Sequence, residues 1–474
     1  MKQNKKQRYS IFLVVIMILA MLLAACKTGN EEQITDVVPK TASVGSGNNS
    51  GTSGMVAVDG GESGDMFAAA FSERDLTNGY DAEGAVSIVL SGSSIEASAS
   101  SVKVSGSNAT ITEAGTYILS GTLTDGTVYV DADKEDKVQI VLSGADITSS
   151  DFAAIYVLQA DKVFLTLADG TVNSLKNGGT FRDEDENNVD AVVFSKDDLT
   201  LNGTGKLIIT SPAQNGIAGK DEVTITSGTY EITAGNHAIQ AEDSLAIAGG
   251  EFTIVSEQDG LHCENDEDDT LGNIYIAGGS FTIQAKDDAV HAIAVLQIDG
   301  GNLDITAAEG LEATYVRING GEIAIQASDD GVNAAKKSTA YTPTFEMNDG
   351  YLKVVMGPGD TDGIDANGNI VINGGTIDVT GNSTFDYDGT AQLNGGTVIC
   401  NGQQVSTLPN QMMGGGRGGD FGGGGFGGNG GENNPGYGGQ GNEGNPGFGG
   451  KGNEGNPGFG GQEGRGNPGE GRRK

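Results

Sequence analysis

Residues 320–335 read GGEIAIQASDDGVNAA, and close copies of this stretch recur along the chain. Two glycines come first, aliphatic residues then occupy every second position, and two aspartates precede another glycine. A period of two is typical of β-strands, and paired glycines are typical of turns. The stretch therefore predicts a strand that follows a turn and ends at an acidic corner, which leads into a further short strand.

Six segments share the first half of this pattern without gaps. They read EVTITSGTYEITA, SLAIAGGEFTIVS, NIYIAGGSFTIQA, VLQIDGGNLDITA, YVRINGGEIAIQA and NIVINGGTIDVTG. A short third strand follows, such as DAVHA at 288–292 or DGVNA at 330–334. Three strands in about 20 to 30 residues predict one coil of a parallel β-helix, because a propeller blade needs about 40–50 residues. Stacked coils would share one aliphatic core, so we predict an all-β solenoid.

Equivalent residues of successive coils stack at a strand spacing of about 4.8 Å. If Val332 and Ala334 face the core, alternation turns Gly331 and Asn333 outward. The column through Gly331 holds only glycine and alanine, and the column through Asn333 is polar. We therefore expect a shallow groove with a floor of small residues and walls of acids and amides. Its predicted ligand-binding residues are Gln240, His262, His291, Gly310 and Gly331.

Carboxylates stacked this closely repel one another unless a cation lies between them, and Ca²⁺ accepts oxygen ligands at about 2.3–2.6 Å. We expect calcium to be held by Asp287, Asp288, Glu309, Glu312, Asp329, Asp330 and Asn333. A further site is expected from Asp360, Asp362 and Asp365. A plainer alternative is that Asp-Gly and Asn-Gly sequences only form the corner turn. The oxygen-rich surroundings of the histidines favour calcium over zinc, which prefers clusters of His and Cys.

The two ends of the chain differ from the repeats. Residues 1–26 have a basic start, an apolar run and the ending LLAAC, which is typical of a bacterial lipoprotein signal. We expect Cys26 to be lipidated and to hold the protein at the extracellular face of the bacterial cell membrane. Residues 27–65 are predicted to be a flexible linker, 66–408 the folded domain, and 409–474 a disordered Gly-, Asn- and Pro-rich tail.

Composition narrows the choice of partner. The formal net charge is −37, which argues against nucleic-acid binding through Lys and Arg contacts to phosphate. The chain has no tryptophan, which disfavours a flat surface on which neutral sugar rings stack. Only Cys263 and Cys400 follow Cys26, so we expect no disulfide framework. Cys263 occupies the column of Ala292, Ala313 and Ala334, so we expect it to face the core. We also expect a monomer.

Several stretches resemble a family of secreted bacterial carbohydrate-binding β-helix proteins. They are FSERDL from Phe71, AGTYILSGTLTDGTVYVDADKEDKVQIVLSGADITS at 114–149, and the coils that contain INGG and DDGVNAA. The resemblance implies a right-handed parallel β-helix similar in shape to pectate lyases. It also implies bound calcium and binding of plant cell-wall polysaccharides, with cellulose and acidic pectin-type chains as candidates.

Two other functions stay open. A calcium-dependent polysaccharide lyase needs a base beside the metal, and Lys286 is the best placed, followed by Arg317, Lys336 and Lys337. Lys286 is equally compatible with a charge-balancing surface lysine. The third function is a structural adhesion spike that binds no sugar. Among sugars, a calcium-bridged uronate polymer such as polygalacturonate fits the lack of tryptophan best.

Overall fold

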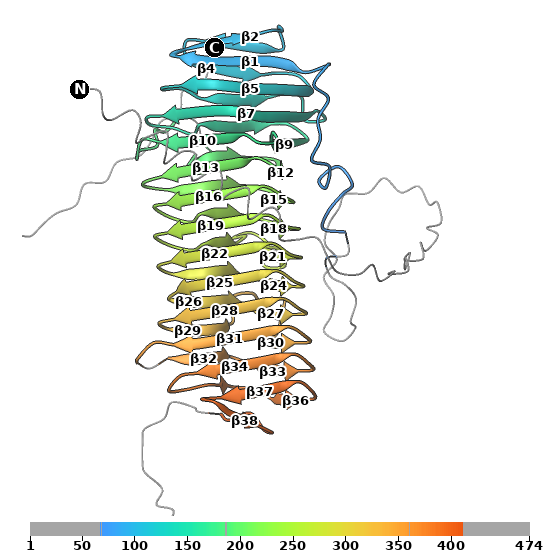
Figure 1. Ribbon diagram of the computed structural model, residues 1–474, viewed down its shortest axis with the longest axis vertical. Helices are drawn as coiled ribbons and strands as arrows, with labels where there is room; N and C mark the ends of the chain where they lie inside the picture. The colour runs from blue at the N-terminus through green and yellow to red at the C-terminus, as the bar shows by residue number, and fades with distance from the viewer. Residues whose placement is uncertain (1–66, 68, 185–186, 360, 411–474) are drawn as a thin grey trace, which may run out of the picture. The chain divides into compact units, whose positions relative to one another are not determined.

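The computed structural model describes residues 67, 69–184, 187–359 and 361–410, which all fall within one compact unit. These residues form strands β1 to β38, which follow one another along a single stacking axis (Figure 1). None of them forms a helix that is long and apolar enough to cross a membrane. The predicted signal with Cys26, the linker and nearly all of the tail lie outside the described residues, so the domain boundaries stay predictions.

From β8 onward, each strand up to β34 pairs in parallel with the strand three places later in the chain, as in β13–β16, β14–β17 and β15–β18. Three columns of strands result. The first two belong to a 25-stranded sheet and the third to a 13-stranded sheet. The structure is thus an all-β parallel solenoid, as the sequence predicts.

The strands of the first column begin the repeat. They are β9 (Lys162–Leu167), β12 (Asp198–Gly203), β15 (Glu222–Ile225), β18 (Ser244–Ile247), β21 (Asn273–Ile276), β24 (Val295–Ile298), β27 (Tyr315–Ile318), β30 (Thr344–Met347), β33 (Asn369–Ile372) and β36 (Ala391–Leu393). The second column contains β10 (Val172–Asn177), β13 (Lys206–Ser211), β16 (Thr229–Ala234), β19 (Glu251–Ser256), β22 (Ser280–Ala285), β25 (Asn302–Ala307), β28 (Glu322–Ala327), β31 (Tyr351–Met356), β34 (Thr376–Thr380) and β37 (Thr397–Cys400).

The third column carries the candidate site. It contains β8 (Ile155–Gln159), β11 (Ala191–Ser195), β14 (Asn215–Gly219), β17 (Ile239–Ala241), β20 (Leu261–Cys263), β23 (Asp288–Ala292), β26 (Glu309–Ala313), β29 (Asp330–Ala334), β32 (Asp362–Ala366) and β35 (Asp386–Tyr387).

The ends of the stack are less regular. The first strands are β1 (Val86–Gly92), β2 (Ser94–Ala97), β3 (Val102–Ser105), β4 (Asn108–Ile111), β5 (Gly115–Leu123), β6 (Val128–Asp131) and β7 (Lys137–Ser149). The long β7 pairs with both β9 and β10, so it spans two columns. Antiparallel pairs β1–β2 and β3–β4 lie at one end, and β38 (Gln403–Val405) pairs antiparallel with β37 at the other.

The core consists of aliphatic side chains stacked on their equivalents. Ile283, Ile305, Ile325 and Val354 are in register along the second column and fully buried. Each such side chain contributes roughly 1.5–3 kcal/mol when it leaves water. Cys263 is also buried in this core, which confirms its predicted inward direction.

The turn between the first and second columns explains the Asn-Gly-Gly sequences. The Nδ2 of Asn348 donates to Asn319 Oδ1 at 2.8 Å, and that of Asn373 donates to Asn348 Oδ1 at 2.8 Å. Gly321 follows with φ +94°, a backbone conformation that side chains disfavour. Stacked amides therefore hold this turn in one register along the solenoid.

Phe67 and residues 69–80 form a strap that crosses the first column. Phe67 stacks on Tyr275 of β21 with ring centroids 4.7 Å apart, and Gln139 of β7 donates to the carbonyl of Gly79 at 3.3 Å. Between these points the buried Asp75 accepts a hydrogen bond from Thr200 at 2.7 Å and pairs with Lys162 at 3.0 Å. The strap thus runs along several coils of the solenoid.

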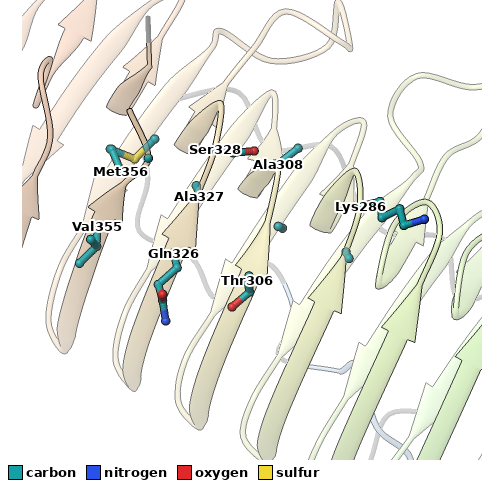
Figure 2. Close-up of a pocket in the computed structure, with 11 residues that line it drawn as sticks. Lys286, Thr306, Ala308, Gln326, Ala327, Ser328, Val355 and Met356 are labelled. Carbon is teal, nitrogen blue, oxygen red and sulfur yellow. The ribbon is translucent and has the colours of Figure 1, made fainter. Parts of the chain in front are cut away.

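The corner between the second and third columns varies in length. Ala307 and Glu309 enclose one residue, whereas Ala327 and Asp330 enclose two. A hollow with a volume of about 420 Å³ lies at this corner across β22, β25, β28 and β31 (Figure 2).

The Asp75→Ala substitution should destabilise the protein by about 3 kcal/mol, because it leaves the largely buried Lys162 ammonium without its carboxylate. Urea denaturation measures this free energy of unfolding. Glu73→Ala, an exposed acid of the same strap, should change it by less than about 0.5 kcal/mol. Equal effects of the two variants would show that the strap is not fastened through Asp75.

Candidate functional site

The third column stacks the polar residues that the sequence predicts. The residues Gln240, His262, His291, Glu312, Asn333 and Asp365 are paired in register from β17 to β32. A second stack stands beside them at the corner, where Asp288 pairs with Glu309 and Asp330 with Asp362. We call these two stacks, together with His237, Asp259 and Lys337, the carboxylate–histidine ladder.

The predicted groove floor of glycines is wrong. A Cβ on Gly331 would lie 2.3 Å from Val354 Cγ1, and a Cβ on Gly310 would lie 2.6 Å from Ile325 Cγ2. Val354 and Ile325 are core residues, so Gly310 and Gly331 face inward. Alternation fails here because the chain bends at the corner, and two consecutive residues then point to the core. The glycines make room for the neighbouring core side chain and do not form an outward-facing floor.

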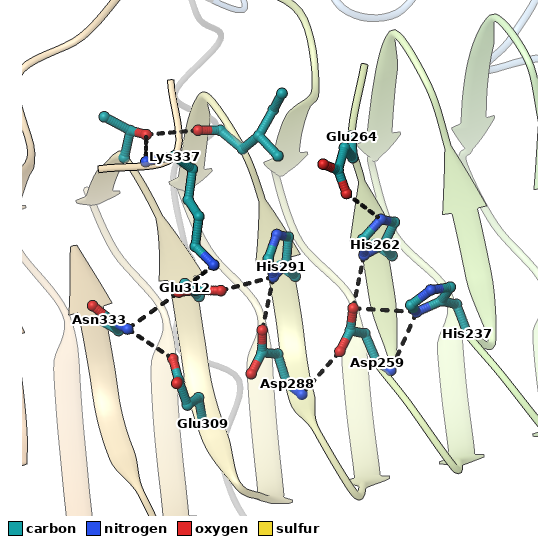
Figure 3. Close-up of polar contacts among 12 residues, drawn as sticks. His237, Asp259, His262, Glu264, Asp288, His291, Glu309, Glu312, Asn333 and Lys337 are labelled. Atoms are coloured by element: carbon teal, nitrogen blue, oxygen red, sulfur yellow. Dashed lines mark hydrogen bonds and ion pairs between the residues drawn. The ribbon is translucent and has the colours of Figure 1, made fainter. Parts of the chain in front are cut away.

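One end of the ladder is built from histidines (Figure 3). Asp259 Oδ2 lies 2.7 Å from His262 Nδ1 and 3.2 Å from His237 Nδ1. The two imidazoles stack with centroids 4.1 Å apart, and His262 stacks on His291 at 5.0 Å. His262 Nε2 also lies 3.4 Å from Glu264. Both nitrogens of His262 thus face carboxylates of the protein.

The middle of the ladder is a closed network of charges. His291 Nδ1 lies 2.7 Å from Asp288 Oδ2 and 2.8 Å from Glu312 Oε2. Lys337 Nζ lies 3.0 Å from the other oxygen of Glu312 (Figure 3). Asn333 Nδ2 donates to Glu309 at 2.9 Å and to Glu312 at 3.1 Å. Glu312 therefore has its charge balanced by the protein itself.

The pKa values follow from this arrangement. Burial opposes the charged imidazole of His291, but hydrogen bonds to Asp288 and Glu312 outweigh burial and raise its pKa to about 10. Burial also opposes ionisation of Glu312, yet His291 and Lys337 hold its pKa below the usual value. Burial together with the charges of Asp259 and Glu312 raises the pKa of Asp288 to about 6, although the hydrogen bond from His291 lowers it.

The other end of the ladder is acidic. Burial and the charge of Glu312 raise the pKa of Glu309 to about 8. Burial and nearby aspartates raise the pKa of Asp330 to about 7 and that of Asp365 to about 6. Within the described residues, neither Asp330 nor Asp365 forms an ion pair with a basic side chain. Acidic groups are therefore concentrated here, and no protein cation of the described part pairs with Asp330 or Asp365 to favour their ionised form.

The corner acids also serve the fold. Asp259 Oδ1 accepts the backbone N–H of Asp288 at 3.0 Å, and Asp330 Oδ1 accepts that of Asp362 at 3.1 Å. These two corner carboxylates thus cap the corner of the next coil. This contact agrees with the alternative in which the acids form the turn. The second oxygen of Asp259 is already held by His237 and His262, whereas among the described residues no hydrogen bond or ion pair uses the second oxygen of Asp330.

The remaining predicted residues are spread around the corner. Asp287 and Asp329 are exposed beside the ladder, and their side chains form no hydrogen bond or ion pair within the described part of the chain. Lys286 pairs with the exposed Glu257 and lines the hollow of Figure 2, where it does not meet the ladder. Gln240 accepts a hydrogen bond from Asn215 at 2.8 Å. Asp360 lies outside the described residues.

His237 is the member of the ladder that was missed from the sequence, and Lys337 was predicted in a different role. His237 occupies the corner position of its coil, which reads NHAIQA and lacks the Asp-Gly signature. Its spacing of three residues before Gln240, the same as that of Asp259 before His262, was the available signal. Lys337 was proposed as a base of secondary rank, but it follows the third strand and returns to Glu312, which no repeat pattern indicates.

Comparison with known proteins gives three matches. A family model described as "Carbohydrate-binding domain-containing protein" matches residues 105–360 and 308–404. A protein of the same description from Acetivibrio thermocellus is 33% identical over 186 residues, which cover 39% of this chain and 59% of that protein. The chain therefore spans less than two thirds of that relative. A solved structure of the polysaccharide lyase-like protein from C. thermocellum, a gadolinium derivative, is 32% identical with a TM-score of 0.45 and covers 51% of this chain and 94% of that one.

The Gly331→Ala substitution should destabilise the protein by about 1–3 kcal/mol, because the new methyl group collides with Val354 and the Gly363 carbonyl. Urea denaturation provides the measurement. In Gly79→Ala, the matched control, the methyl group meets nothing within 4 Å, so stability should be unchanged or slightly higher. If Gly331→Ala is as stable as the native protein, Gly331 does not face the core and the predicted outward-facing groove floor would stand.

When a chelator removes metal ions, the protein should have a lower melting temperature at pH 8 than at pH 5. Glu309 holds its proton in the fold up to about pH 8 but loses it earlier in the unfolded chain, so its contribution to stability falls as pH rises toward 8. His291 acts in the same direction, because its raised pKa gives stability below pH ~6.5 that is lost as pH rises toward 10.

Glu309→Gln tests this assignment, since glutamine cannot ionise. The variant should lose less thermal stability than the native protein between pH 5 and pH 8, as measured by differential scanning calorimetry. The control is Glu322→Gln at an exposed position of β28, which should leave the pH profile unchanged. An unaltered profile in Glu309→Gln would show that Glu309 is not buried among other acids.

Proposed function

Because this chain belongs to the family of carbohydrate-binding domain-containing proteins, we propose that its carboxylate–histidine ladder binds an acidic cell-wall polysaccharide. The proposed ligand is a pectin-type chain such as polygalacturonate, and cellulose is a second candidate. We further propose that the solenoid is a right-handed β-helix with three strands per coil. The pairing of each strand with the third strand after it supports this coil.

The acidic end of the ladder carries the proposal that calcium takes part. Glu309, Asp330 and Asp365 are half-buried acids with raised pKa values, so a divalent cation would relieve a repulsion that the protein leaves in place. Asn333 directs its Nδ2 toward Glu309 and Glu312, and its buried Oδ1 has no hydrogen-bond partner among the described residues. Carboxylate and amide oxygens are the ligands that Ca²⁺ prefers.

The residues present therefore fit calcium at the acidic end better than at the histidine end. Asp330, Asn333, Asp362 and Asp365 would hold the ion and would have to draw together to do so, because the all-carboxylate group of the described residues whose oxygens already lie within 4.8 Å of one another is Asp288, Glu309 and Glu312. When bound, calcium would supply positive charge that attracts the carboxylate of a sugar acid. At the other end, the charges of Asp259 and Glu312 are already paired with basic side chains, namely His237, His262, His291 and Lys337. A metal ion would therefore relieve less repulsion there.

The periodicity of the ladder suits a polymer. Equivalent side chains repeat about every 4.8 Å along the third column, so a chain that lies along the stacking axis meets the same kind of group at each coil. Single sugars would use only one or two coils. The repeat thus supports a polysaccharide as the partner more than a free monosaccharide.

We also propose that the protein acts at the outer face of a bacterial membrane as a lipoprotein. The lipobox-like ending at Cys26 and the polar stretch at 27–65 support a lipid anchor with a spacer. A monomer remains the expected state. Nucleic acid is not an expected partner, because the net charge is strongly negative.

The two alternatives make different demands on the site. Lys286 is a poor candidate for a lyase base, because its ammonium pairs with Glu257 away from the ladder. Lys337 lies within the ladder at 3.0 Å from Glu312 and is the better candidate if cleavage occurs. The adhesion spike requires no ligand at all.

Co-sedimentation with insoluble polygalacturonate, with and without a chelator, tests the proposal. Calcium-dependent binding without ultraviolet absorbance from unsaturated uronides is the expected result, because the acidic end would attract uronate carboxylates through the metal. Formation of unsaturated product would identify a lyase. If the protein does not bind polygalacturonate in the presence of calcium, the adhesion spike becomes the favoured function.

The variant Asp330→Asn/Asp365→Asn assigns the binding to the acidic end. It should weaken calcium-dependent binding at least by the roughly 10–100-fold that loss of metal-site partners costs. Asp304→Asn is the matched control, since Asp304 is an exposed acid on β25. Equal binding by the double variant and the native protein would place the polysaccharide site elsewhere.

A further inference from the structure

The chain has three histidines, and the fold brings all three together at one end of the ladder. His237 and His262 stack with ring centroids 4.1 Å apart, and His262 stacks on His291 at 5.0 Å (Figure 3). His237 lies at the corner before β17, His262 within β20 and His291 within β23. All the imidazole nitrogens of the protein are therefore gathered in one place, and imidazole is a ligand that suits zinc and related divalent metals.

Three ligand atoms converge between the first two of these coils. One ring nitrogen each of His237 and His262 and one carboxylate oxygen of Asp259 all lie within 4.8 Å of one another. Asp259 Oδ2 is 3.2 Å from His237 Nδ1 and 2.7 Å from His262 Nδ1. Ligand atoms of a tetrahedral zinc ion with bonds of about 2.0–2.1 Å lie roughly 3.3 Å apart. One pair thus already has this spacing, and the other must open by roughly 0.6 Å.

The surrounding contacts orient these groups as metal ligands are oriented. Asp259 Oδ1 accepts the backbone N–H of Asp288 at 3.0 Å, which directs Oδ2 toward the histidines. The Nε2 of His262 lies 3.4 Å from Glu264, and a histidine that ligates a metal commonly donates its other ring N–H to a carboxylate. The Asp259 N–H donates to His237 Nδ1 at 3.3 Å, which requires the proton-free nitrogen that a metal also requires.

Charge and access also suit a divalent ion. The carboxylates of Asp259 and Glu264 carry two negative charges beside two imidazoles, so neutral histidines and one divalent ion would leave the group uncharged. The side chains of Asp259 and His262 are 5% and 10% exposed, whereas that of His237 is 17% exposed. An ion here would be shielded by protein and reached beside His237. Calcium is a poorer match, because it takes about six to eight oxygen ligands.

We propose that His237, Asp259 and His262 form a binding site for zinc or a similar divalent transition metal. Three protein ligands leave a fourth tetrahedral position for water or for an oxygen of a bound ligand. A lone pair lies in the plane of its ring, so the two imidazoles turn out of their parallel stack to share the ion, and the broad χ2 preference of histidine permits this rotation. The expectation that calcium is favoured beside the histidines did not include His237, whose second imidazole changes the balance.

Titration calorimetry with zinc chloride on the full chain, in excess calcium, tests the site. The native protein should bind one zinc ion here, and cobalt in place of zinc should give the intense visible absorption of a tetrahedral Co²⁺ centre. His237→Gln and His262→Gln should each abolish this absorption and weaken zinc binding by more than the roughly tenfold that loss of an outer partner costs. Circular dichroism without metal should show that both variants keep the β fold.

Glu264→Gln separates a metal site from hydrogen-bonded histidines. It should weaken zinc binding by roughly 10–100-fold, because the carboxylate partner of His262 is lost. Glu267→Gln is the matched control, since Glu267 is an exposed acid of the same connection, and it should bind zinc like the native protein.

Three results would overturn the proposal. They are zinc binding no tighter in the native protein than in His237→Gln, only the weak cobalt absorption of an octahedral ion, and an equal loss in Glu267→Gln. Asp330→Asn/Asp365→Asn should bind zinc like the native protein, because its substitutions lie in later coils. The site is independent of the proposed polysaccharide binding, whose assay contains calcium and no zinc, so the two outcomes are distinguishable.

Discussion

In-register parallel pairing places every outward side chain of this protein about 4.8 Å from its own equivalents in the coils before and after. Aliphatic residues benefit from this arrangement, as the column from Ile283 to Val354 does, and asparagines benefit because each amide both donates and accepts. Carboxylates do not, since like charges at this distance raise one another's pKa values. The ladder resolves the conflict in two ways. Histidines and Lys337 alternate with acids at one end, and at the other end the acids stay unbalanced.

Sequence periodicity was sufficient to predict the solenoid and the polar stack through Asn333, because both depend on residues within straight strands. It failed at the corner, where Gly310 and Gly331 face the core. A period of two describes a chain that runs straight, and a bend lets two consecutive residues point the same way. His237 was missed because its coil keeps the spacing of its neighbours without their residue types. Lys337 reaches Glu312 from outside the repeat, so only the folded chain brings the two together.

The corner between the second and third columns thus separates two surfaces of different character. One carries acids, of which Asp259 and Asp330 also cap the corner of the next coil. The other carries methyl groups, hydroxyls and amides around a shortened connection. The two surfaces are separated by corner connections that differ in length by one residue. The strands on either side keep the same pairing whatever the length of the corner. Loops of a solenoid can therefore acquire new surface chemistry while the core stays constant.

The strap has a mechanical consequence. A pull on the chain ahead of Phe67 enters the fold at the side of the stack, beside β21, and then travels toward β7 along the stacking axis. The contacts of Phe67 with Tyr275, of Asp75 with Lys162 and Thr200, and of Gly79 with Gln139 lie one after another along this path. Tension is therefore shared in shear among several coils, and no terminal coil is peeled from the stack first.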